Sequence, residues 1–93
     1  MTYRFHSAGK LVVGKKPVKF KEYPSNVKKV RLIASSDNTG TIWICGAMAE
    51  VDEGYPLYAG DKLLLEISNP EDLYFISDAD GQKLYYIFIA ENI

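Results

Sequence analysis

The sequence has few of the residues that stabilise or activate most small proteins. Among its 93 residues there is one cysteine, Cys45, and one histidine, His6. One cysteine cannot form a disulfide within the chain, and one Cys with one His cannot supply the four ligands of a structural zinc site. A chain of this size therefore depends on tight packing or on oligomerisation for its stability.

Long apolar runs are also missing. No segment approaches the roughly 18 to 20 apolar residues that a membrane-spanning helix needs, and the first ten residues contain no hydrophobic signal core. We therefore expect a protein that is made and folded in a cytosol and has no membrane partner. Cys45 lies in an apolar run, so we expect a small buried side chain and not a nucleophile.

Motifs of catalysis and metal binding are equally scarce. Glu50, Asp52 and Glu53 cluster without a nearby histidine, which is more typical of a solvated loop than of a glycosidase pair. The stretch 78–81 (DADG) looks like the start of a calcium loop, but Ile89 stands where that loop needs a bidentate Glu. The sequence predicts no enzyme, no cofactor and no metal site.

The charge is unevenly distributed, although the net charge is only −1. Residues 1–31 carry nine of the eleven Lys and Arg and one acidic residue, whereas residues 32–93 carry two basic and eleven acidic residues. Such asymmetry can mark a nucleic-acid-binding arm. A basic nucleic-acid binder, however, usually keeps a positive total charge. We therefore predict no nucleic-acid partner, and expect opposite charges to face each other across the fold or between subunits.

Alternating apolar and polar residues, interrupted by turn-forming clusters, predict a chain of β-strands. The strands are expected at 11–13, 17–22, 27–34, 41–45, 62–67, 72–77 and 84–90. Residues 47–51 are expected to form either a brief strand or one helical turn. Turns recur at the intervals typical of a sandwich or barrel. We expect one small all-β domain over 14–93, after an arm over 1–13 that is flexible or ordered by a partner.

Two turns are expected to close β-hairpins. The first is the cluster 35–40 (SSDNTG), which separates the strands 27–34 and 41–45. The second contains Asp80-Gly81, in which the glycine supplies the positive φ that tight hairpin turns need. The strand 84–90 is apolar on both faces, so we expect a neighbouring subunit to cover the face that the core does not.

Aromatic residues make up 13% of the chain, and seven of them are tyrosine, a residue favoured at protein interfaces. The residues predicted to contact partners are Trp43, Tyr55, Leu57, Tyr58, Tyr85, Ile87, Ile89, Lys15, Lys16, Lys19 and Lys21. An aromatic platform for a saccharide is the alternative interpretation of the tyrosines.

Three stretches, SSDNTGTIWICG (35–46), GYPLYAGDKLLLEI (54–67) and DLYFISDADGQKLYYIFI (72–89), together resemble small structural proteins of tailed bacteriophages. In that family a D-N-T-G-T turn leads into a strand, a G-x-P-L-x-A-G-[DE] segment opens the next strand, and an A-x-G-Q-x-[LV] segment lies near the end of the domain. The resemblance does not extend to the first 26 residues. Its matching positions determine the fold: Asn38, Gly40, Gly54, Gly60 and Gly81.

The resemblance implies an antiparallel β-sandwich, jelly-roll-like, of about six to eight strands. It also implies a non-enzymatic virion protein, made in the cytoplasm of a bacterial host. The expected role is that of a capsid cement or decoration protein that stabilises neighbouring capsid subunits. Its partners would be the major capsid protein or other virion proteins and further copies of itself, with a trimer favoured. The alternatives are a tail- or fibre-associated protein and a cupin-like, saccharide-binding module.

Overall fold

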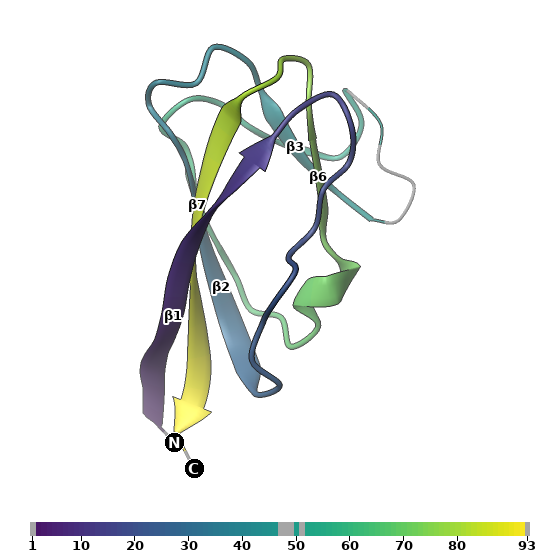
Figure 1. Cartoon of the computed structure of the whole chain (residues 1–93). Coiled ribbons are helices and arrows are strands. Elements are labelled where there is room, and N and C mark those ends of the chain that lie inside the picture. Colours follow the sequence, from purple (N-terminus) through teal and green to yellow (C-terminus); the bar gives the residue numbers. More distant parts are fainter. Residues whose placement is uncertain (1, 47–49, 51, 93) are drawn as a thin grey trace.

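Two antiparallel β-sheets pack face to face in the computed structural model of the chain, which describes residues 2–46, 50 and 52–92 (Figure 1). One sheet has the strand order β1-β7-β2-β5 and the other β4-β3-β6. The strands are β1 (Thr2–Val13), β2 (Val27–Ala34), β3 (Ile42–Cys45), β4 (Tyr55–Leu57), β5 (Lys62–Leu65), β6 (Tyr74–Ser77) and β7 (Gln82–Asn92), and a 3₁₀ turn, η1, spans Pro70–Asp72. The predicted all-β sandwich is confirmed.

The strands pair in the nested order of a jelly roll. The first strand pairs with the last, β1 with β7, while β2 pairs with β5 and β3 with β4. The segment that follows β1 pairs with β6 through one bridge. In this bridge the backbones of Val18 and Phe75 exchange hydrogen bonds of 2.9 and 2.8 Å. Double-sheet jelly rolls have eight strands. In this chain the strand that would follow β1 is reduced to the single bridge at Val18.

The two predicted hairpins do not form, because each turn carries the chain from one sheet to the other. β2 and β3 flank the first turn but belong to different sheets, and so do β6 and β7 on either side of the second. Gly81 does have a positive φ, of 77°, as predicted. Local turn chemistry was therefore predicted correctly, whereas the strand pairing that it implied was wrong.

Side chains join these two turns to each other at one end of the sandwich. The buried Gln82 accepts hydrogen bonds at Oε1 from the backbone N–H groups of Thr39 (2.8 Å) and Gly40 (2.9 Å). Asn38 accepts a bond from the Lys83 N–H (2.8 Å) and donates one to its carbonyl (3.0 Å). These bonds satisfy backbone groups that a hairpin would have paired within the turn, and they hold both turns as corners between the sheets.

The first strand is much longer than the sequence predicts. Only 11–13 was expected to be extended, whereas β1 pairs with β7 over Thr2–Val13, with one irregularity between Phe5 and Ser7. The prediction of a strand at 17–22 is wrong except for the single bridge at Val18. The side chains of this segment do alternate as predicted, with Phe20 buried. The prediction for 47–51 falls largely on residues that the structure does not describe.

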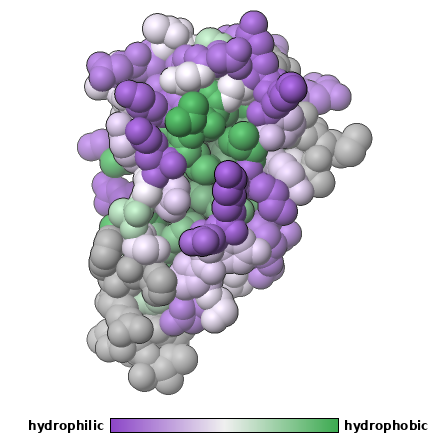
Figure 2. Space-filling model, viewed as in Figure 1, coloured by the Kyte–Doolittle hydropathy of each residue, from purple (hydrophilic) through white to green (hydrophobic). Residues whose placement is uncertain are grey.

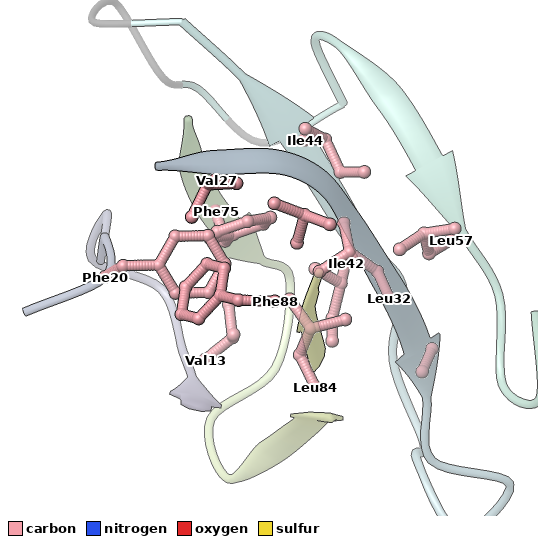
Figure 3. Packing of buried hydrophobic residues seen from close by; sticks show 12 residues of the cluster. Val13, Phe20, Val27, Leu32, Ile42, Ile44, Leu57, Phe75, Leu84 and Phe88 are labelled. Atoms are coloured by element: carbon pink, nitrogen blue, oxygen red, sulfur yellow. The ribbon is translucent and has the colours of Figure 1, made fainter. Parts of the chain in front are cut away.

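The core lies between the inner faces of the two sheets. Figure 3 shows the rings of Phe20, Phe75 and Phe88 together on one side of the cluster, and the ring centroid of Phe20 lies 5.4 Å from that of Phe75 and 5.0 Å from that of Phe88. In 27–34 the alternation is confirmed, since Val30, Leu32 and Ala34 are buried, and in 84–90 the buried residues are Leu84, Phe88 and Ala90. In the part of the chain that the structure describes, no helix is long and apolar enough to span a bilayer.

Candidate interaction surfaces

The outer face of the four-stranded sheet combines apolar and basic side chains. The strand register places two rows across it: Ala8, Ile87, Arg31 and Leu64 in one, and Lys10, Tyr85, Ile33 and Lys62 in the next. The exposed fractions are 57% for Val12, 47% for Leu64 and 42% for Tyr85. Val12 and Leu64 lie on the two edge strands, and Tyr85 lies between them with the half-buried Ile33 and Ile87. Apolar side chains exposed in this way are typical of a contact surface, and we call this surface the outer face.

A shallow depression lies near the middle of the outer face. It has a volume of about 280 Å³ and is lined by Arg31, Ile33, Tyr85, Tyr86 and Ile87. The two isoleucines come from neighbouring strands, since Ile33 lies opposite Tyr85 and Arg31 opposite Ile87 across the β2–β7 pair. An apolar side chain of a ligand would be desolvated on entering this depression, and Arg31 offers a charged hydrogen-bond donor to a polar group beside it.

Positive charge surrounds these apolar residues. Lys10, Arg31, Lys62 and Lys83 are exposed at outward positions of their strands. The Lys29 ammonium at the same face lies 3.8 Å from the carboxylate of Glu66. The outer face therefore combines apolar side chains with basic ones, including Arg31 near its middle, and is complementary to a surface with apolar and acidic groups.

A second hollow opens at the edge of the sandwich, between β1 and the segment 18–22. It has a volume of about 510 Å³ and is lined by Lys10, Leu11, Val12, Val18, Lys19, Lys21, Glu22 and Tyr86. Figure 2 shows apolar atoms, in green, between β1 and the segment that follows it, surrounded by hydrophilic side chains. We call this hollow the edge groove.

The structure distributes the predicted interface residues over several places. Tyr85, Ile87 and Ile89 lie on the outer face, with Tyr85 exposed and the isoleucines half-buried. Two of the predicted lysines, Lys19 and Lys21, line the edge groove. The other two, Lys15 and Lys16, are exposed in the loop after β1 and do not line it.

The residues predicted around β4 divide differently. Tyr55 and Tyr58 are largely exposed, as a partner surface requires. Leu57 is 1% exposed and Trp43 is 9% exposed, so neither offers an accessible side chain. Leu57 is buried because it lies opposite Ile42 on the inner side of the β3–β4 pair.

Sequence reasoning missed several residues of both surfaces. Ile33 and Lys10, which lie beside Tyr85, and Leu64, which lies beside Arg31, were not singled out, because these positions depend on which strands pair. The contact of Tyr86 with the edge groove depends on the segment 18–22 leaving β6 after one bridge.

Comparison with known proteins adds no assignment to these surfaces. No protein-family model, no curated protein and no solved structure matches the chain. Among the residues that the structure describes, no group of three or more His, Cys, Asp or Glu side chains is arranged to hold a metal ion. The fold and the two surfaces are therefore the basis for a functional proposal.

Proposed function

We propose that the protein is a non-enzymatic structural protein of a bacteriophage virion, and that it acts as a capsid cement or decoration protein. The observation that carries the proposal is the outer face, where Val12, Leu64 and Tyr85 are exposed in one sheet. The family resemblance of the turns and strands supports it. The fold agrees, since jelly rolls are common in viral capsid proteins, although they also occur in lectins and cupins.

The charge of the outer face favours a different protein as its partner over a second copy of the same face. In a two-fold symmetric contact the same patch meets itself, so Arg31, Lys10 and Lys62 would face cations of the other copy. Like charges brought together in this way oppose association. We therefore assign the outer face to an acidic and apolar surface on the capsid, and any contact between copies of the chain to other parts of the molecule.

The size of the outer face favours a repeated assembly as its partner. Four strands about 4.8 Å apart and about six residues long cover roughly 400 Å². A stable isolated interface buries about 800 Å² on each partner. A contact of half that size is weak by itself, but it becomes effective when several copies are held on one lattice, because later contacts form within the same assembly.

The test is the location of the protein in particles from a host that carries its gene. Particles purified by density gradient should contain the protein in a fixed ratio to the major capsid protein. Loss of the protein should lower the temperature at which capsids release DNA. A Leu64→Glu/Tyr85→Glu variant should fold normally but be depleted from particles.

If the wild-type protein remains in the lysate and never migrates with particles, the proposal is wrong. If it migrates only with detached tails, the tail alternative holds.

A saccharide-binding module is the second candidate, and Tyr55 and Tyr58 support it. Their side chains are 57% and 59% exposed, so both rings are accessible. Binding to a glycan array that a Tyr55→Ala/Tyr58→Ala variant loses would favour this function. A uniformly negative array for the wild-type protein would count against it.

A further inference from the structure

The edge groove is bordered by two stretches of backbone without sheet partners. β1 is the terminal strand of its sheet and pairs only with β7. Across the groove, Val18 is bonded to Phe75, but residues 19–22 form no backbone hydrogen bond with another described segment. The bridge does not extend because β6 begins only at Tyr74, directly after η1. Unpaired strand edges of this kind are templates for an added strand.

Tyr86 gives the groove a fixed aromatic wall. Its ring centroid lies 4.8 Å from that of Phe20 and 5.1 Å from that of Phe88, so core packing holds the ring. Its hydroxyl lies over Gly9, where a Cβ atom would come within 2.5 Å of the oxygen. Within the described chain this hydroxyl has no hydrogen-bond partner and is not buried. It therefore remains able to bond to a ligand.

The charge of the groove selects for an acidic ligand. Lys10, Lys19 and Lys21 line it together with one acidic residue, Glu22. Lys19 is also positioned over the ring of Tyr74, at 5.3 Å from its centroid. The other lining residues, Leu11, Val12 and Val18, are apolar. An extended segment with alternating acidic and apolar residues would place its apolar side chains against this wall and its carboxylates near the lysines.

We propose that the edge groove binds an extended acidic peptide segment of a partner protein, which adds as a strand to the free edge of β1. In strand addition, main-chain hydrogen bonds provide affinity and side-chain pockets provide specificity. Single-stranded nucleic acid fits less well, because it is usually bound by several stacking rings, and among the described residues that line the groove Tyr86 is the one aromatic. The edge groove shares Lys10 and Val12 with the border of the outer face, but the proposal does not require a role in the virion.

The test is binding of the full chain to a library of labelled eight-residue peptides that alternate Glu or Asp with varied apolar residues. Members should bind with dissociation constants of about 10 to 100 μM at low salt, typical of small peptide contacts. A matched library with Lys in place of the acids should not bind. N-methylation of alternate amides in a binding peptide should abolish binding, since it removes the main-chain donors that strand addition needs.

Variants of the protein locate the site. Lys10→Glu/Lys21→Glu should weaken binding about tenfold or more, whereas Lys15→Glu/Lys16→Glu, with the same change in net charge outside the groove, should weaken it less than about threefold. Tyr86→Phe keeps the packed ring and removes only the hydroxyl, so a loss of about three- to tenfold is expected. Thermal melts should show that all three variants fold.

Three results would overturn the proposal. The first is the absence of any acidic peptide that binds better than its lysine counterpart. The second is binding that the two lysine pairs affect equally, since the charge of the groove would then not be used. The third is an oligothymidine that binds more tightly than every peptide and depends on Lys21, which would assign the groove to nucleic acid.

Discussion

The inner and outer faces of the four-stranded sheet have similar residues and opposite surroundings. On β2, Leu32 is fully buried, whereas the neighbouring Ile33 is only half-buried. On β7, Phe88 is packed against the core and Tyr85 is exposed. Hydrophobicity therefore does not by itself distinguish the buried face of β7 from the exposed one. The distinction comes from the second sheet, which covers one face and leaves the other exposed.

The largest expected effect is that of Phe88→Ala on the inner face. The ring of Phe88 packs at 5.0 Å from Phe20 and 5.1 Å from Tyr86, between centroids, and would leave a cavity. Such truncations cost about 3 to 5 kcal/mol of unfolding free energy, which is a large part of the stability of a domain this small. Urea unfolding followed by circular dichroism measures the loss. A cost below about 1 kcal/mol would show that this face is not the core.

The next largest effect is expected at the polar end of the inner face, where Gln82 begins β7. Gln82→Ala removes the acceptor of the Thr39 and Gly40 N–H groups. Both bonds are partly buried and Gln82 is only 3% exposed, although water can reach the N–H of exposed Thr39. We therefore expect a loss of about 1 to 3 kcal/mol.

Asn38→Ala is the matched control for this corner. It removes two hydrogen bonds that are exposed to solvent, and should cost only about 1 kcal/mol because water can replace them. Comparable losses for the two variants in urea unfolding would mean that the corner does not depend on the buried side chain.

The sequence predicted single strands better than their partners. Period-two alternation assigned the inward positions of β2 correctly, whereas 84–90 is apolar on both faces and its pattern alone did not say which face lies inward. The chain contains nothing equally local that specifies pairing, and the long-range bonds of Gln82 and Asn38 reverse the expectation that 35–40 closes a hairpin. For the same reason Tyr85 and Ile87 were recognised as candidate contacts, while Ile33 and Leu64 beside them were not.

A smaller effect on stability is expected on the outer face. Ile87→Thr keeps a β-branched side chain at a half-buried position that lines the depression of the outer face. Surface substitutions in a strand usually change stability by less than about 1 kcal/mol. The measurement is urea unfolding at two protein concentrations. A loss of more than about 2 kcal/mol that grows with concentration would mean that a second copy covers the outer face, contrary to the charge argument above.

The smallest effect on stability is expected from Glu66→Gln at the border of the outer face. The carboxylate lies 3.8 Å from the Lys29 ammonium, and the Glu66 side chain is 74% exposed. Exposed pairs contribute about 0.2 to 1 kcal/mol, less when salt screens them, so the melting temperature at 150 mM salt should barely change. The same substitution removes a negative charge from a basic surface, so association with purified capsids should become faster at low salt and be unchanged at high salt. If association becomes slower instead, Glu66 contacts a positive group of the partner, and the partner surface is not acidic at that point.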